Sequence, residues 1–425
     1  MKNDKMIFKD SIKDFLKKFL FVTYVENGKF YLNIKIPIRF DARIIYRLFY
    51  ASRHIIKNKV VFDNYMGKGY GCNPKYVANK LLELYPNKFD IVWIVSEKDR
   101  NDTEYPKGIR IVNYGSIQSK IEYATSKVWI SNYHKISYLK KGMYKKKNQV
   151  FIQMWHGSLG IKKIENDVPI LTTNNSWLNL AKMSSAMVDY WISNSDFESN
   201  IYKRAFWDVR NILEYGHPRN DIFFIDNINV KNKVEKYFNI INKKIVFYAP
   251  TFREDYRLDC YKINFQLLIE TLSNKFGGEW CVIVRLHPRV RKFSKEVLGG
   301  SNNVYDGTYY SDIQELIASS DIMITDYSSC IFDFLLTKRP AFIFATDVEE
   351  FNNERGFYYP LEKTPFLIAK NNDELVYNIL AFNNEVYKSK INLFLKDKGC
   401  IEDGNASERV AKLINSIIDE EMIKN

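Results

Sequence analysis

The sequence contains a series of short, almost uninterrupted apolar segments that alternate with longer polar stretches. These segments cover residues 90–95, 127–131, 149–154, 190–193, 244–248, 280–286, 321–325 and 340–344. Strands that are apolar along their whole length belong to parallel sheets buried on both faces, and connecting helices cover those faces. The alternation therefore predicts an α/β protein.

The apolar segments form two clusters, one on each side of a polar stretch at 226–244 that is rich in Asn and Lys. A chain of 425 residues fits two domains of roughly 150–200 residues each better than a single domain. We expect an N-terminal helix and lead-in at 1–40, a first Rossmann-like domain at 41–220, a second at 221–400 and a C-terminal helix at 401–425.

Composition excludes several other classes of protein. Hydrophobic residues make up 46% and charged residues 27%, which is a globular balance and not that of a disordered chain. The five cysteines are widely spread and contain no CxxC pair, which argues against a zinc ribbon or a disulfide scaffold and fits a reducing compartment. No stretch approaches the ~18 consecutive apolar residues of a membrane span, and we expect no signal peptide.

The chain is basic, with a net charge of +13. Such an excess indicates phosphate-bearing partners, namely nucleic acid, anionic lipid or nucleotide, and a codon bias toward Lys, Asn, Ile and Tyr explains it equally well. A nucleic-acid-binding protein would present a basic stripe with exposed aromatic residues. The aromatic residues here fall largely inside the apolar segments, so we expect no nucleic-acid partner.

Residues 1–22 form a separate piece in which apolar residues recur at helical spacing and lysines crowd the remaining positions. This pattern is typical of an amphipathic helix that lies on an anionic membrane. A helix that packs its apolar face on the body of the protein has the same pattern, so both interpretations stay open.

The first candidate site follows the apolar segment at 149–154 and reads Trp-His-Gly-Ser-Leu-Gly from Trp155. Ligands of α/β sheets collect at the carboxyl ends of strands, and a histidine placed there suits a general base. Gly157 and Gly160 allow the backbone to approach a ligand closely. A His156 that only caps the end of the strand fits equally well.

The second candidate, Gly216-His217-Pro218-Arg219, falls at the expected hinge between the domains. The planar donor fork of Arg219 suits phosphate, and a simple hinge turn built from Gly and Pro explains the same residues.

The third candidate is Pro250-Thr251-Phe252-Arg253, at the end of the segment at 244–248. The Thr251 hydroxyl and nearby backbone amides can hold a phosphate, and a turn from strand to loop is an equal alternative.

The fourth candidate is Arg285-Leu286-His287-Pro288. On a strand, Arg285 and His287 would share one face, where a cation and a histidine side by side suit developing negative charge.

The fifth candidate, Asp326-Tyr327-Ser328-Ser329 with Asp333 one turn later, predicts a strand, a short turn and a helix. Two serines at a helix start offer hydroxyls beside free backbone N–H groups, and the helix dipole attracts phosphate. Plain N-capping by one serine is the alternative.

In this order, the five motifs resemble those of one family, the CDP-glycerol glycerophosphotransferases of teichoic-acid and capsule synthesis. The resemblance covers roughly residues 110–390 and includes a trailing Arg355-Gly356-Phe357-Tyr358. Each motif alone is weak, and the ordered set is specific. The chain departs from the pattern after Trp-His-Gly, where it reads Ser-Leu-Gly-Ile-Lys-Lys and the family often has Thr-Pro and then Lys.

The resemblance implies a GT-B-like α/β fold, with two Rossmann-like domains that face a central cleft. The N-terminal domain would take the acceptor and the C-terminal domain the CDP-linked donor. By the family pattern, His156 is the base on the acceptor hydroxyl, and His287 with Arg285 stabilises the diphosphate. The donor site would also include Gly157, Ser158, Leu159, Gly160, Arg219, Pro250, Thr251, Leu286, Ser328, Ser329 and Asp333.

The implied reaction is transfer of glycerol phosphate or ribitol phosphate from a CDP-polyol to a hydroxyl, with release of CMP. We expect no cofactor and no essential metal, because the motifs supply cations and helix N-termini but no carboxylate cluster. The implied partners are the CDP-polyol donor, a lipid-linked or polymeric polyol or glycan acceptor, and the anionic cytoplasmic face of the bacterial membrane, where the protein would dock peripherally. The oligomeric state stays open, and a GT-B nucleotide-sugar glycosyltransferase is the alternative.

Overall fold

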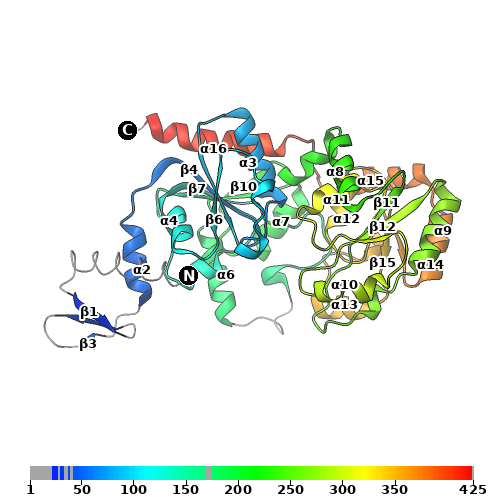
Figure 1. The fold of residues 1–425 in the computed structure, drawn as a ribbon, viewed down its shortest axis with the longest axis horizontal. Coiled ribbons are helices and arrows are strands. Elements are labelled where there is room, and N and C mark those ends of the chain that lie inside the picture. The colour runs from blue at the N-terminus through cyan, green and yellow to red at the C-terminus, as the bar shows by residue number, and fades with distance from the viewer. Residues whose placement is uncertain (1–21, 27–28, 33–36, 39–41, 169–174, 424–425) are drawn as a thin grey trace.

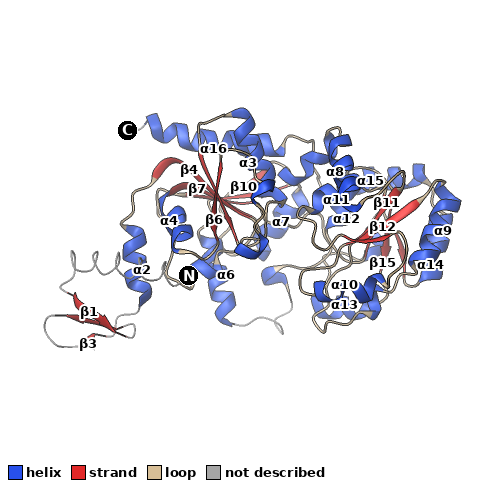
Figure 2. Ribbon diagram, viewed as in Figure 1, coloured by secondary structure: helices blue, strands red, loops and turns tan. Residues whose placement is uncertain are grey.

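The computed structural model describes residues 22–26, 29–32, 37–38, 42–168 and 175–423. Residues 1–21, which carry almost all of the amphipathic pattern, lie outside the described residues. The described chain forms two α/β domains side by side, and a small antiparallel sheet stands apart from both (Figures 1 and 2). That small sheet consists of β1 (Val22–Glu26), β2 (Lys29–Leu32) and β3 (Pro37–Ile38).

The first domain is built on a seven-stranded parallel sheet in the order β10-β9-β8-β7-β4-β5-β6. Its strands are β4 (Ile56–Asp63), β5 (Asp90–Val95), β6 (Ile109–Asn113), β7 (Ser126–Ser131), β8 (Val150–Gln153), β9 (Tyr190–Ser193) and β10 (Ile212–Glu214). Its helices are α2 (Ala42–Ala51), α3 (Cys72–Leu84), α4 (Ile117–Thr125), α5 (Ile136–Leu139), α6 (Asn175–Ala186) and α7 (Asp196–Ala205).

Apolar side chains cover both faces of this sheet, as successive residues of a strand point to opposite sides. Val60 of β4 packs in a cluster with α3, whereas its neighbour Val61 packs in a second cluster with α4, α5 and α7. The sheet is therefore a buried central layer between two layers of helices.

The second domain has a six-stranded parallel sheet in the order β13-β12-β11-β14-β15-β16. Its strands are β11 (Lys244–Tyr248), β12 (Trp280–Val284), β13 (Val304–Asp306), β14 (Ile322–Thr325), β15 (Ala341–Phe344) and β16 (Leu367–Ala369). Its helices are α8 (Ile228–Phe238), α9 (Phe265–Phe276), α10 (Ser294–Leu298), α11 (Ile313–Ser319), α12 (Cys330–Leu335), α13 (Val348–Arg355), α14 (Asn372–Leu380) and α15 (Asn384–Asp397).

The C-terminal helix α16 (Ala406–Ile423) leaves the second domain and packs on α3 of the first (Figure 1). Its buried residues Val410, Ala411, Ile414 and Ile418 join the same cluster as Val60. The chain thus passes from the first domain into the second near the 3-10 helix Pro218–Phe224 and returns to the first after α15.

The structure confirms the predicted α/β class, with two parallel-sheet domains, and a strand at each of the eight predicted apolar segments. The predicted boundaries near residues 220 and 400 stay predictions. No helix in the described part of the chain is long and apolar enough to cross a membrane.

Candidate active site

The site lies where the loop after β8 meets the second domain. Leu159 and Ile161 of this loop are buried in the apolar core of the second domain. A Cβ atom added to Gly160 would lie 2.9 Å from the Cβ of Ser329, so the two loops are in direct contact and only glycine fits there. The Tyr358 N–H donates to the Ile161 carbonyl at 2.7 Å, and this hydrogen bond attaches the loop after β8 to the second domain. The first and fifth sequence motifs are therefore neighbours.

His156 is held by a hydrogen bond and by aromatic rings. Its Nδ1 lies 2.9 Å from the carbonyl oxygen of Asn132, and a carbonyl only accepts, so Nδ1 carries the proton. Nε2 is then the bare nitrogen that can accept a proton. The ring stacks on Trp155 at 4.3 Å and on Tyr133 at 5.7 Å, and Tyr65 meets it edge-on at 5.0 Å.

The backbone before His156 is strained. Trp155 has φ of +43°, which a non-glycine residue adopts at a cost on the order of 1–3 kcal/mol. The buried Trp155 ring is fixed by Phe206 at 4.7 Å and His134 at 5.4 Å, and this packing holds the strained turn. Burial, and secondarily the nearby positive charge of Arg219, lowers the pKa of His156 to about 4, although the Asn132 carbonyl opposes the shift.

His287 has the opposite tautomer. The backbone N–H of Arg289 donates to Nδ1 of His287 at 3.3 Å, so in the neutral ring the proton is on Nε2, which is a donor. The ring stacks on Phe252 at 5.3 Å. Loss of hydration and the positive charges of Lys162 and Arg289 lower the pKa of His287.

The expectation that Arg285 and His287 share one face of a strand is wrong, because β12 ends at Val284. Nη1 of Arg285 donates to the carbonyls of Gly307 and Tyr310, and the Leu286 N–H donates to the Thr308 hydroxyl at 3.1 Å. Arg285 and Leu286 therefore fasten the end of β12 to the loop after β13, whereas His287 and Pro288 are exposed.

Ser328 and Ser329 lie at the start of α12, as the strand–turn–helix prediction expected. Ser329 occupies the N-cap position, but its side chain makes no capping hydrogen bond. The Ser328 hydroxyl accepts a hydrogen bond from the Cys330 thiol at 3.0 Å. Both serines are partly exposed, so their hydroxyls and the first amides of α12 are open to a ligand.

Pro250 and Thr251 follow β11 beside this turn. The Thr251 N–H donates to Asp326 at 2.8 Å, and its Oγ1 atom is buried with no hydrogen-bond partner among the described residues. A buried hydroxyl without a partner is costly and fits a ligand atom at this position. Arg253 is buried and structural, since its Nη1 pairs with Asp326 at 2.9 Å and its Nε with Asp347 at 2.7 Å.

Arg219 joins the two domains from inside. Its Nε lies 3.0 Å from Oδ2 of Asp333, and its Nη2 donates to the Gly157 carbonyl at 2.5 Å. Its backbone N–H donates to Asn73 at 3.1 Å, at the start of α3. Ser158, in the same loop, is buried and accepts a hydrogen bond from Asn194 at 2.9 Å. Arg219 and Asp333 thus bring the second and fifth motifs together and fix the loop that carries His156.

Three residues of the candidate site were not predicted from the sequence, namely Asn132, Tyr133 and Lys162. Asn132 and Tyr133 follow β7, and the rule that ligands collect at the carboxyl ends of strands already pointed to this position. Lys162 had a weaker signal, since it lies in the loop where the chain departs from the family pattern. Burial lowers its pKa to about 8, and its charge acts on both His156 and His287.

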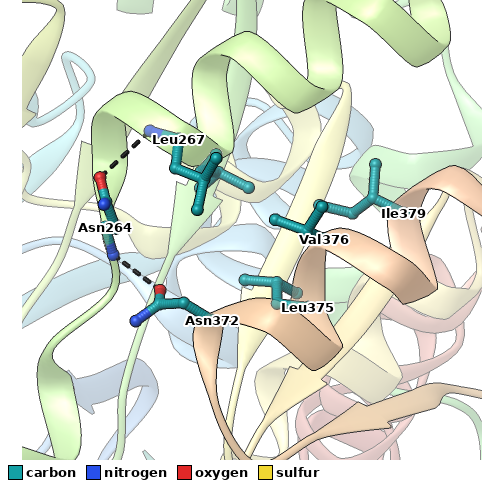
Figure 3. Close-up of a pocket in the computed structure, with 7 residues that line it drawn as sticks. Asn264, Leu267, Asn372, Leu375, Val376 and Ile379 are labelled. Carbon is teal, nitrogen blue, oxygen red and sulfur yellow. Dashed lines mark hydrogen bonds between the residues drawn. The ribbon is translucent and has the colours of Figure 1, made fainter.

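Another concave region, between α9 and α14, lies on the side of the second domain turned away from the first (Figure 1). Figure 3 shows Leu267 and Val376 facing each other across this seam, and Asn264 donates its N–H to Asn372 at 2.8 Å. The seam is helix packing that leaves no room for a water molecule. Nowhere in the described ranges do three or more His, Cys, Asp or Glu side chains gather as a metal would need.

The two parallel sheets define a two-domain α/β protein, and its candidate site gathers histidines, serines and arginines where loops of the two sheets meet. The model of one family, CDP-Glycerol:Poly(glycerophosphate) glycerophosphotransferase, matches residues 44–416. The chain belongs to this family.

Relatives agree with this assignment. The teichoic acid poly(glycerol phosphate) polymerase of Staphylococcus epidermidis is 30% identical over 413 residues, which is 92% of this chain and 55% of that protein. The chain therefore spans about half the length of that relative. The polymerase of the same name from Bacillus spizizenii is 32% identical over 366 residues, 83% of this chain and 91% of that protein.

A solved structure of the wall teichoic acid polymerase TagF, a variant soaked with CDPG, is also similar. It has a TM-score of 0.78 and 28% identity, and the match covers 90% of this chain and 94% of that chain.

Proposed function

We propose that this chain transfers glycerol phosphate, or ribitol phosphate, from a CDP-polyol to a hydroxyl of a teichoic-acid, capsule or lipid-linked acceptor, with release of CMP. Its family, its polymerase relatives and the CDPG soaked into the TagF structure support this substrate class.

The observation that carries the proposal is the opposite tautomers of the two histidines. His156 offers a bare Nε2, which accepts a proton, whereas neutral His287 offers Nε2–H, which donates to a phosphate oxygen. A phosphoryl transfer needs one group of each kind, a base for the incoming hydroxyl and a donor for the phosphate that gains charge.

In the proposed reaction, the acceptor oxygen attacks the β-phosphorus and its proton passes to Nε2 of His156. A new P–O bond forms, the bond from the β-phosphorus to the bridging oxygen breaks, and CMP leaves with that oxygen. The pKa of about 4 keeps His156 neutral before the donor binds. The negative diphosphate raises this pKa once it lies beside the ring, which strengthens the base.

Donor phosphates would lie against the start of α12. Ser328, Ser329 and Thr251 supply hydroxyls there, and His287 supplies an N–H group. Positioning and charge neutralisation account for most of the rate of such a transfer. We propose that these groups replace an essential metal and that the two domains form a GT-B-like fold. Dialysis against EDTA should leave activity unchanged.

A nucleotide-sugar glycosyltransferase of surface-polysaccharide synthesis is the second candidate, since the fold alone fits both. The experiment that separates them offers CDP-glycerol, CDP-ribitol, UDP-glucose and GDP-mannose to the protein with a lipid-linked acceptor. CMP release from a CDP-polyol supports the proposal. Nucleoside diphosphate release from a sugar donor, without CMP release, refutes it.

We further propose that the protein docks peripherally on the cytoplasmic face of the membrane, because the acceptor is lipid-linked and the chain carries +13. Each basic residue near an anionic surface contributes about 1 kcal/mol, and salt screens the attraction. Deletion of residues 1–22 should reduce sedimentation with anionic liposomes at low salt. An unchanged bound fraction together with a lower melting temperature would show that this segment packs on the body instead.

A further inference from the structure

Lys162 lies in the segment that crosses from the first domain to the second. The segment is extended, and Lys162 pairs antiparallel with Phe357. Successive side chains of an extended segment point to opposite sides. The side chain of the next residue, Lys163, lies over Gly356 and lines an open hollow of about 330 Å³. Lys162 therefore points the other way, toward the site.

The charged groups near Lys162 also indicate that its side chain points toward the candidate site. Asp326 and Cys330, which follow β14, Arg355, at the end of α13, and Arg253, which follows β11, all lie near enough to act on its charge. Lys162 in turn acts on His156 of the first domain and on His287 after β12. Its ammonium group therefore lies close enough to both histidines for its charge to act on them.

Within the described part of the chain, no carboxylate lies within ion-pair distance of the Lys162 ammonium group. Among the described residues, no hydrogen bond or ion pair engages its Nζ atom. The nearby carboxylate of Asp326 is already bound by Arg253 at 2.9 Å and by the Thr251 N–H at 2.8 Å. A half-buried cation without a partner is costly, and an anion that enters the site removes this cost.

We propose that Lys162 is a catalytic residue whose ammonium group binds the diphosphate of the donor between His156 and His287. There it neutralises the negative charge that gathers on the departing CMP. The inference rests on the proposed function and adds a cation that the five motifs do not contain. The lowered pKa of about 8 also means that the free protein loses this charge in mildly alkaline solution.

The test compares Lys162→Met and Lys162→Arg with the matched control Lys163→Met, whose side chain points into the hollow. Calorimetry measures binding of CDP-glycerol and of cytidine at pH 7 and pH 9. Lys162→Met should weaken CDP-glycerol binding at pH 7 by at least about tenfold, because a charged hydrogen bond is lost. Cytidine, which has no phosphate, should bind all variants equally, and Lys163→Met should behave as the wild type.

The pH series gives a second readout. Wild-type affinity for CDP-glycerol should fall between pH 7 and pH 9 as Lys162 loses its proton. Lys162→Arg should keep its affinity at pH 9, since the guanidinium stays charged. Lys162→Arg also tests the proposal if Lys162→Met does not fold. If its affinity for CDP-glycerol falls between pH 7 and pH 9 as steeply as that of the wild type, the proposal is overturned.

Failure of this inference differs from failure of the proposed function. If the wild type transfers glycerol phosphate and Lys162→Met binds the donor equally well, only the role of Lys162 is overturned. A lower melting temperature of Lys162→Met with unchanged affinity overturns that role in the same way. If the wild type does not bind CDP-glycerol, the proposed function fails, and inorganic pyrophosphate becomes the probe: equal affinity for wild type and Lys162→Met then overturns the diphosphate site.

Discussion

Arg219 and Asp333 form a buried ion pair, with Nε and Oδ2 3.0 Å apart, that links the 3-10 helix Pro218–Phe224 to helix α12 of the second domain. Desolvation lowers the pKa of Arg219, but Asp333 more than offsets this, so the net pKa lies well above the usual value. Because Arg219 also holds the Gly157 carbonyl, the pair sets the position of His156 relative to the serines of α12.

Asp333→Asn should therefore destabilise the protein. Removal of one partner of a buried pair leaves the other charge unpaired, at a cost of about 3–5 kcal/mol. Urea unfolding measures the loss. The control is Asp397→Asn, an exposed aspartate 3.1 Å from Lys398, where a surface pair is worth about 0–1 kcal/mol. Equal losses in the two variants would contradict the role of the buried pair.

His156→Gln should abolish transfer and leave donor affinity close to that of the wild type, because Nε2 serves the acceptor. With a pKa of about 4, His156 of the donor-free protein stays neutral above that value, so its titration should not change kcat/KM between pH 6 and pH 8. A folded-state pKa below the ordinary 6.5 means that protonation opposes folding, and stability should fall as the pH drops from 6.5 toward 4. His54→Ala, an exposed histidine, is the control. Near wild-type turnover of His156→Gln would refute its role as base.

Ser328→Ala with Ser329→Ala, and separately His287→Ala, should weaken CDP-glycerol binding or turnover at least tenfold, about 1.4 kcal/mol. Neither serine side chain caps α12, so stability should change little. The matched control is Ser195→Ala, since Ser195 does cap α7 through the Glu198 N–H at 3.1 Å. That variant should lose about 0.5–2 kcal/mol of stability and keep its donor affinity. If the Ser328 and Ser329 variant instead behaves as Ser195→Ala does, these serines are only helix caps.

Glu402 should make stability depend on pH. Burial raises its pKa to about 7, although His217, Asn220 and Asn194 donate to it. Because the folded-state pKa exceeds the ordinary 4.5, the folded protein binds the proton more tightly, and stability falls as the pH rises from 4.5 to 7. The change is up to about 3 kcal/mol.

Melting curves from pH 4.5 to pH 8 test this prediction. Glu402→Gln should flatten the dependence, whereas Glu279→Gln, at an exposed position, should leave it as in the wild type. Glu198, which lies 2.8 Å from Nε2 of His217, titrates nearby and stays intact in both variants. Parallel curves for Glu402→Gln and the wild type would show that Glu402 is ionised in the folded protein.

The parallel sheets were predictable because most of their strands are continuous apolar runs. The inner strand β4 was not predicted, because its first three residues are exposed and its apolar run covers only Val60 to Phe62. Lys59 within it is buried because it pairs with Glu122 at 2.7 Å, which no periodicity reveals. The edge strands β13 and β16 have only three residues each, too few for a pattern.

The site was predictable as a set of motifs but not as a geometry. Strand ends pointed to His156, Thr251, His287 and Ser328, and parallel sheets place such ends at one edge. The contacts between elements did not follow from sequence. Nothing in the spacing indicated that the loop after His156 enters the core of the second domain, which places Lys162 in the site.

Growth of the acceptor is the most direct measure of whether the protein transfers glycerol phosphate with His156 as the base. The wild type and His156→Gln are incubated with CDP-glycerol and a lipid-linked acceptor, and mass spectrometry measures acceptor growth beside the CMP released. We predict that the wild type adds glycerol phosphate to the acceptor, one CMP for each unit, and that His156→Gln adds none while it still binds the donor. An acceptor that gains a sugar from a nucleotide-sugar donor, or CMP release that does not depend on acceptor or on His156, would contradict the account.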